Sequence, residues 1–189
     1  MRTIGIVLAG GLSRRFGSPK AFAMSGDKHF YEIAVDVLSP LCDQVVIVTR
    51  PELIQRHREE DYVLTDIIEF AGLGPLAGIL SGMESVEADR YVVLPTDMPY
   101  VTSEVLEKLM GYHKKGITAV ISEERRHPLV SIWDNHFKNA LRNALENERL
   151  SVMRLLDENH SCWIPGYLLT DNEELVFTNV NTPDVLERG

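Results

Sequence analysis

The feature that most constrains this chain lies at its beginning, where a short apolar run ends at a glycine pair. Residues 4–8 have the length and content of a buried strand. Gly10 and Gly11 follow, and because they lack side chains the backbone can turn sharply and a ligand can approach it closely. Backbone N–H groups exposed after such a turn can bind phosphate oxygens. The sequence therefore opens with a strand and a candidate phosphate loop.

Three cations follow the glycine pair with no acidic residue between them: Arg14, Arg15 and Lys20. They supply countercharge, and arginine adds a fork of donors that fits phosphate. The loop matches neither the Walker loop nor the three-glycine Rossmann fingerprint. A strand followed by a solvated basic turn is the alternative, which a Gly-Gly pair alone would favour. With Ser13 and Gly17 also in place, we favour the phosphate loop.

Composition restricts the partners of this loop. The 189 residues suit a single domain spanning residues 1–189. The net charge of −9 argues against a nucleic-acid or anionic-membrane partner, so the local basic loop suits a small polyphosphate. Cys42 and Cys162 are far apart, so we expect no disulfide framework or zinc site, and two reduced thiols fit a cytosolic location. We expect neither a signal peptide nor a membrane span.

Apolar strand-like runs alternate with helix-like stretches along the chain. This alternation predicts an α/β fold, a Rossmann-like three-layer sandwich with a mostly parallel central sheet. The tail is expected to form a strand near residues 175–178, a loop and the start of a final helix. The other predicted strands are residues 3–9, 45–48, 62–65, 91–94, 117–121 and 127–133, and the predicted helices are residues 30–38, 52–58, 75–86, 102–110, 135–147 and 151–156.

Two aspartates follow predicted strands, Asp66 directly and Asp97 after Pro95 and Thr96. In an open parallel sheet, ligands bind outside the carboxyl ends of strands, so we expect Lys20, Asp66 and Asp97 around one crevice. Asp97 lies in a turn stiffened by flanking prolines and is a natural ligand for Mg²⁺, which takes few carboxylates plus water and substrate phosphates. The alternatives are that Asp97 caps the helix beginning near Thr102 and that Asp66 caps a turn.

Two further segments suggest ligand contacts. Gly74 and Gly78 allow a helix to start close to a ligand, and a helix N-terminus favours anions; tight packing of that helix is the alternative. Asn179 and Asn181 alternate, so in an extended segment they share one face, where they could hold a substrate or bind backbone.

Several of these motifs resemble those of a known family. Leu-Ala-Gly-Gly-x-Ser-x-Arg-x-Gly-x-x-Lys, from Leu8 to Lys20, resembles the signature of nucleotidyltransferases. Gly-Pro-Leu-Ala-Gly after Asp66, Asp-Met-Pro at Asp97 and Asn-x-Asn-Thr-Pro at Asn179 resemble motifs of the molybdenum cofactor guanylyltransferases, the MobA-like nucleotidyltransferases. The match covers the chain in motif order. His127-Pro128-Leu129 resembles a segment near the acceptor side of that fold, and Phe16 departs from the expected methionine.

The resemblance implies a fold of the nucleotide-diphospho-sugar transferase type and transfer of GMP from GTP to the phosphate of molybdopterin or molybdenum cofactor. It implies Mg²⁺ held by Asp97, catalysis by Lys20, Asp97 and Arg15, and substrate contacts from Asn179 and Asn181. It also implies transient contact with other molybdenum cofactor biosynthesis proteins. The nucleotide-binding residues that it implies are Leu8, Ala9, Gly10, Gly11, Lys20, Asp66 and Asp97.

Two other functions stay open at this point. A cytidylyltransferase, acting on the same cofactor or on another phosphorylated small molecule, would share the fold and the loop, and no residue identifies the base pocket. A nucleotide-binding adaptor without turnover is the non-enzymatic alternative. The presence of both Lys20 and Asp97 argues against the adaptor, because a pure binder needs no catalytic metal site.

Overall fold

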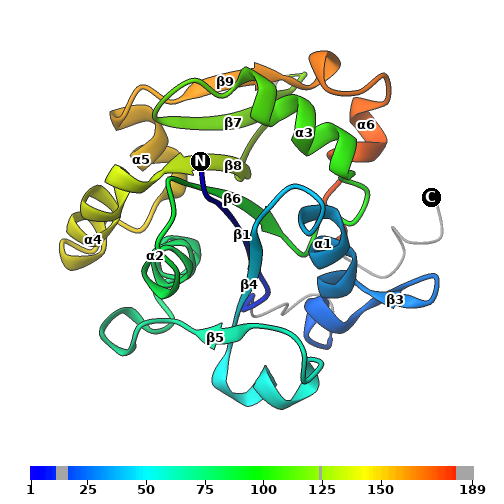
Figure 1. Cartoon of the computed structure of the whole chain (residues 1–189), viewed down its shortest axis with the longest axis vertical. Helices are drawn as coiled ribbons and strands as arrows, with labels where there is room; N and C mark the ends of the chain where they lie inside the picture. The colour runs from blue at the N-terminus through cyan, green and yellow to red at the C-terminus, as the bar shows by residue number, and fades with distance from the viewer. Residues whose placement is uncertain (12–16, 124, 182–189) are drawn as a thin grey trace.

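A seven-stranded sheet runs through the middle of the molecule in the order β5-β4-β1-β6-β8-β7-β9 (Figure 1). This computed structural model describes residues 1–11, 17–123 and 125–181. Only β8 runs against its neighbours, so the predicted mostly parallel sheet is confirmed. The strands are β1 (Thr3–Leu8), β4 (Gln44–Thr49), β5 (Val63–Thr65), β6 (Arg90–Pro95), β7 (Ile117–Ser122), β8 (Arg125–Asp134) and β9 (Cys162–Pro165), with a separate hairpin of β2 (Met24–Ser25) and β3 (Lys28–His29).

Helices cover both faces of the sheet and complete the predicted three-layer sandwich (Figure 1). Ile4 and Ile6 of β1 pack into the cluster with one set of helices, and Val7 packs into the cluster with the other. A strand buried on both faces must be apolar throughout, which explains the continuous apolar run at the start of the chain. One face carries α1 (Phe30–Leu38), α3 (Ser103–Tyr112) and α6 (Glu173–Val176), and the other carries α2 (Pro75–Ser85), α4 (Lys138–Glu146) and α5 (Val152–Glu158).

The strand register brings the carboxyl ends of four parallel strands to one edge. Leu8, the last residue of β1, lies opposite Val48 of β4 and Pro95 of β6. Thr49 of β4 lies opposite Thr65, the last residue of β5. The loops that follow these strands therefore meet at one edge, which we call the carboxyl edge.

The tail differs from the sequence prediction. Residues 173–176 form α6 instead of a strand beginning near residue 175. The side chain of Asn172 accepts a hydrogen bond from the backbone N–H of Leu175 at 3.3 Å and caps this short helix. The predicted final helix start lies outside the described residues.

Short elements account for the other differences. The predicted helix at residues 52–58 is a 3₁₀ helix, η2 (Pro51–Arg56), and the helix before residue 147 begins with another, η4 (Asn135–Phe137). The sequence prediction missed β9, which pairs with β7 at the sheet border. The remaining 3₁₀ helices are η1 (Lys20–Phe22), η3 (Ile68–Phe70) and η5 (Gly166–Leu168). Within the described ranges, no helix is long and apolar enough to cross a membrane.

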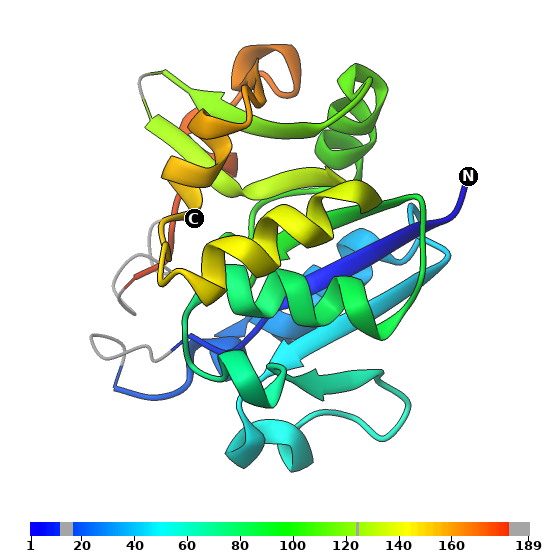
Figure 2. The same cartoon turned by 90° about the vertical axis from the view of Figure 1, so that its left-hand side faces the viewer.

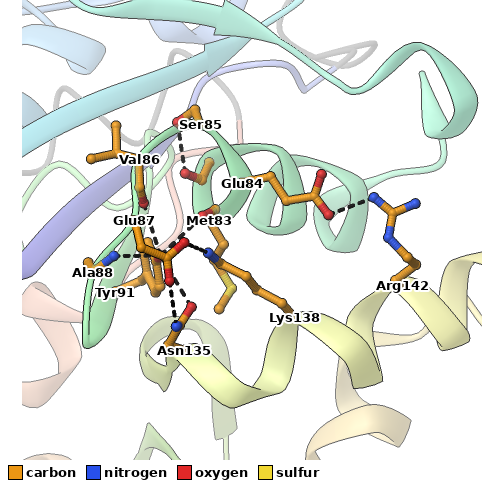
Figure 3. A network of polar contacts seen from close by, with 11 residues as sticks. Met83, Glu84, Ser85, Val86, Glu87, Ala88, Tyr91, Asn135, Lys138 and Arg142 are labelled. Atoms are coloured by element: carbon orange, nitrogen blue, oxygen red, sulfur yellow. Dashed lines mark hydrogen bonds and ion pairs between the residues drawn. The ribbon is translucent and has the colours of Figure 1, made fainter.

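Polar contacts fix the end of α2 that lies away from the carboxyl edge (Figure 3). The hydroxyl of Tyr91 accepts from the N–H of Ala88 and lies 2.9 Å from the carbonyl oxygen of Val86. Lys138 of α4 pairs with Glu87 at 2.8 Å, and Figure 2 shows α2 and α4 lying side by side. Because these contacts hold its C-terminal end, α2 keeps its N-terminus at a fixed position on the carboxyl edge.

We expect Gly82→Ala in α2 to destabilise the protein, because a Cβ there would lie 2.8 Å from the Cδ1 atom of Ile6 in β1. Such overpacking costs about 1–3 kcal/mol of unfolding free energy. Gly111→Ala in α3 is the matched control, since its Cβ would meet no described atom within 4 Å. Helix propensity alone should stabilise the control by up to about 1 kcal/mol. Urea unfolding measures both changes, and equal shifts would contradict the packing argument.

Candidate active site

Lys20 is held in place by an aromatic anchor. Phe22, two residues later in η1, is buried and packs against Tyr31 and His57, with ring centroids 5.3 and 4.9 Å away. The guanidinium of Arg56 lies 4.1 Å from the centre of the Phe22 ring. The backbone of Lys20 accepts a hydrogen bond from the N–H of Ala23 at 2.9 Å. This packing fixes the backbone from which the Lys20 side chain extends.

The Lys20 ammonium meets two predicted site residues from distant parts of the chain. Its Nζ lies 3.6 Å from Oδ2 of Asp97 and donates to Oδ1 of Asn181 at 2.8 Å. The lysine side chain is 14% exposed and the aspartate side chain 29% exposed, so the pair is partly shielded yet reachable by a ligand. The structure thus brings Lys20 and Asp97 together, as the sequence analysis predicted, and adds Asn181 to the same ammonium.

Asp97 is positioned by its backbone rather than by a helix. It follows β6 and Thr96, whose N–H donates to the carbonyl oxygen of Leu8 at 3.3 Å. The carbonyl oxygen of Asp97 accepts from the N–H of Val180 at 2.8 Å. The helix-capping alternative for Asp97 is wrong, because Thr102 caps α3 by accepting from the N–H of Val105. The Asp97 carboxylate is therefore not used to cap α3, and it faces the Lys20 ammonium with 29% of its side chain exposed.

Asp66 lies beside the N-terminal half of α2. A Cβ on Gly78 would come within 2.9 Å of Leu8 and 3.8 Å of Oδ1 of Asp66, so this glycine permits the close approach of helix, β1 and carboxylate. Burial raises the pKa of Asp66, and the N–H donor of Gly72, 3.1 Å from Oδ2, opposes that rise. Asp66 therefore caps a turn and also lies at the carboxyl edge.

The glycine turn begins where the sheet bonding of β1 ends. The carbonyl oxygen of Leu8 accepts from Thr96, and the N–H of Ala9 donates to the carbonyl oxygen of Val48 at 2.8 Å. These bonds fix the backbone directly before Gly10 and Gly11. The predicted cations Arg14 and Arg15 and the residues Ser13 and Phe16 lie outside the described residues.

The sequence analysis missed Arg50, which follows β4 at the carboxyl edge. A Cβ on Gly10 would lie 3.8 Å from Cγ of Arg50, so the arginine stem runs beside the glycine turn. Its terminal nitrogen pairs with Glu52 at 2.8 Å, whereas its buried Nε has no hydrogen-bond partner among the residues described. The sequence could have indicated Arg50, because it directly follows an apolar strand, as Asp66 does.

The two predicted asparagines lie on the extended segment 178–181, which crosses the carboxyl edge. Asn181 bonds to Lys20, as described above. Oδ1 of Asn179 is buried, and the described part of the chain offers it no hydrogen-bond partner. A buried acceptor of this kind usually has a donor, so Asn179 is a candidate for ligand contact.

The acidic residues suit a metal ion that arrives with substrate. In the described ranges, no group of three or more His, Cys, Asp or Glu side chains could hold an ion. Asp97 therefore offers a single, partly exposed carboxylate. Mg²⁺ is commonly held by one or two carboxylates together with water and substrate phosphates, so the residues fit this ion.

Ser122 and His127 lie at the same edge, at the end of β7 and near the start of β8. The Ser122 hydroxyl and Nε2 of His127 are 2.6 Å apart, and both side chains are buried. Burial, aided by the charge of Arg125, lowers the pKa of His127 to about 4. His127 is therefore neutral near pH 7, and its ring stacks on Phe177 with centroids 5.3 Å apart.

A parallel sheet that gathers a glycine turn and opposed charges at its carboxyl edge defines a nucleotide-binding α/β protein. The comparison with protein families is more specific. Residues 5–162 match the model of the MobA-like NTP transferase domain. The chain belongs to this family, as the motifs in its sequence indicated.

Relatives and solved structures agree with this assignment. A Geobacillus protein named "Probable molybdenum cofactor guanylyltransferase" is 39% identical over 184 residues, covering 95% of this chain and 94% of that protein. A Bacillus subtilis protein of the same name is 35% identical, covering 97% and 92%. Molybdopterin-guanine dinucleotide biosynthesis protein A from Archaeoglobus fulgidus has 30% identity and a TM-score of 0.80, covering 98% of this chain and 95% of that one.

A more distant neighbour supports the fold alone. The 2-C-methyl-D-erythritol 4-phosphate cytidylyltransferase from Thermus thermophilus has a TM-score of 0.70 at 15% identity, covering 100% of this chain and 97% of that one. The fold is therefore that of the nucleotidyltransferases, as predicted.

The neutral His127 predicts a loss of stability in acid. The pKa of histidine is about 6.5 in an unfolded chain and about 4 for His127 in the fold, so the unfolded chain binds the proton more readily between these values. The free energy of unfolding therefore falls by up to about 3 kcal/mol as the pH drops from about 6.5 to about 4. Above this window His127 is neutral in both states and causes no such loss.

Urea unfolding of His127→Gln between pH 7 and pH 4 tests this expectation. The glutamine cannot take up a proton in this range, so the stability of the variant should fall less steeply than that of the parent protein. His136→Gln removes an exposed histidine and should follow the parent curve. Parallel curves for all three proteins would show that His127 does not titrate as described.

Proposed function

We propose that this protein transfers GMP from GTP to the terminal phosphate of molybdopterin or its molybdenum-bearing form and releases pyrophosphate. One observation carries the proposal: Lys20, which follows the glycine pair in the sequence, meets Asp97 at the carboxyl edge with a separation of 3.6 Å. A cation and a carboxylate so placed can act on one triphosphate. The names of the relatives, 35–39% identical over nearly the whole chain, supply the substrate classes.

The reaction needs one bond to form and one to break. An oxygen of the acceptor phosphate bonds to the α-phosphorus of GTP, and the bond from that phosphorus to the leaving oxygen breaks. Pyrophosphate departs with the electron pair. The acceptor phosphate is already ionised near pH 7, so no strong general base is required. Catalysis then consists of positioning and charge neutralisation.

The residues of the carboxyl edge have distinct roles in this proposal. The turn at Gly10 and Gly11 approaches the nucleotide phosphates through backbone N–H groups. Lys20, with Arg15, neutralises charge on the leaving pyrophosphate. Asp66 binds the nucleotide beside α2, and Asn179 and Asn181 contact the acceptor.

Magnesium fits the proposal through Asp97. A bound Mg²⁺ would neutralise phosphate charge and hold the phosphates in a reactive arrangement. The Lys20 ammonium lies near Oδ2 of the same carboxylate, so the other carboxylate oxygen would remain for a metal ion while Lys20 stays within reach of the phosphates.

The cellular setting remains a prediction. Neither Cys42 nor Cys162 forms a disulfide, which fits a cytosolic location, and Cys162 is exposed. Transient contact with other molybdenum cofactor biosynthesis proteins is likewise part of the proposal.

Lys20→Ala and Asp97→Asn should each reduce kcat/KM by about 100-fold or more, because each removes a charge that acts on the transferring phosphates. Both variants should stay folded, since the pair is partly exposed. The exposed ion pair of Lys28 and Asp36, 2.6 Å apart, supplies the controls Lys28→Ala and Asp36→Asn. Pyrophosphate release measures turnover. Full activity in folded Asp97→Asn would refute the metal assignment.

The substrates are tested by Mg²⁺-dependent pyrophosphate release with each of the four nucleoside triphosphates, with and without molybdopterin. We expect release only with GTP and molybdopterin together, and none after addition of EDTA. Release with CTP would support the cytidylyltransferase alternative. Tight GTP binding without release under any condition would support the adaptor.

A further inference from the structure

The segment that carries Asn179 and Asn181 belongs to no helix or strand, yet it must hold both asparagines near Lys20. Val180 is fully buried and packs with Ala23 and Phe30, and its N–H bonds to Asp97. This fixes one end of the segment. The other end leads back to Phe177, which follows α6 and is 2% exposed.

Phe177 belongs to the buried apolar cluster on the face of α1, α3 and α6, and its ring also meets one polar ring, that of His127. The His127 ring stacks on it with an interplanar angle of 27°. The Ser122 hydroxyl, 2.6 Å from Nε2, fixes the rotation of that ring. A buried polar pair is costly unless it is satisfied, and here the two partners satisfy each other while holding the ring face toward Phe177.

The strand register places this pair at the carboxyl edge. Val93 of β6 lies opposite Ser131 of β8, and β8 runs antiparallel to β6. His127, four residues before Ser131, therefore lies toward the carboxyl end of β6, where Asp97 follows. Ser122 lies opposite Arg125, at the same edge. His127 thus meets Phe177 at the same edge where the carbonyl oxygen of Asp97 accepts from the N–H of Val180.

We infer that His127 is a positioning residue for the acceptor: its ring, oriented by Ser122, sets the place of Phe177 and thereby of Asn179 and Asn181 beside Lys20 and Asp97. The inference rests on the proposed function for the identity of the acceptor. His127 itself touches no reacting atom in this arrangement. Its effect reaches the reaction through Phe177 and the two asparagines.

Substitutions at position 127 separate the ring from the hydrogen bond. His127→Ala removes both, His127→Gln keeps a hydrogen-bond partner for Ser122 but loses the ring, and His127→Phe keeps a ring but loses the hydrogen-bond partner. The inference predicts that His127→Phe resembles the parent protein more closely than His127→Gln does. His136→Ala is the matched control, because His136 also packs on a phenylalanine, Phe137, with centroids 4.4 Å apart, but follows β8 at the opposite edge.

The first measurement needs no substrate. Hydrogen exchange followed by mass spectrometry measures how well the N–H of Val180, which donates to the carbonyl oxygen of Asp97, is protected from exchange. We expect exchange in residues 177–181 to rise by about tenfold or more in His127→Ala and His127→Gln, and by less in His127→Phe. Unchanged exchange in a folded His127→Ala would overturn the inference. If His127→Ala fails to fold, the comparison of His127→Gln with His127→Phe decides the question.

The second measurement is the kinetic effect with GTP and molybdopterin. Loss of the ring should raise KM for molybdopterin and lower kcat by about 10- to 100-fold, because misplaced acceptor contacts disturb the attack geometry. KM for GTP should stay within about twofold, because the glycine turn and Asp66 do not rest on Phe177 and the backbone of Lys20 keeps its support from Phe22. Equal losses for both substrates would point to general destabilisation and contradict the positioning role.

The two measurements separate this inference from the proposed function. If the parent protein transfers no GMP while exchange in residues 177–181 still rises in His127→Gln, the proposed function fails and the structural role of His127 stands. If transfer occurs but the ring has no effect on exchange or on KM for molybdopterin, the inference fails and the proposed function stands.

Discussion

The contact between the Lys20 ammonium and the Asp97 carboxylate depends on strand register more than on any local feature. Lys20 follows β1 through the glycine turn, and Asp97 follows β6, which pairs with β1 in parallel. Because parallel neighbours end together, residues distant in sequence meet at one edge. Asn181 joins the same ammonium from the end of the described chain. The site is thus a product of the sheet, to which each loop contributes one or two polar groups.

The two faces of the sheet support different parts of this edge. On one face, α2 packs so closely on β1 that glycines are required at positions 78 and 82. This closeness brings the start of α2 to Leu8 and Asp66. On the other face, Phe22, Tyr31 and His57 form the anchor of Lys20. The charged groups therefore rest on rigid elements, which suits a reaction that depends on positioning.

The half of the sheet beyond β6 supports the opposite side of the site. Reversal of β8 brings the start of that strand to the carboxyl edge, so that His127 can meet Phe177. The tail then crosses from Phe177 to Asn181 and closes on Lys20. Basic groups are local features on a chain with a net charge of −9, which favours a small polyphosphate bound at one place.

Sequence alone determined most of the strands, most helices and the polar residues at strand ends, because burial imposes apolar runs and turns require glycine, proline or aspartate. The sequence indicated Lys20, Asp66 and Asp97. It could also have indicated Arg50, which directly follows an apolar strand. It left open whether Asp97 rather than Thr102 caps α3, and it predicted a strand near residue 175 where residues 173–176 form a helix, since competing local bonds decide both. Only the tertiary structure decided that Asn181 meets Lys20 and that His127 supports Phe177, because such contacts follow from register and packing between distant segments.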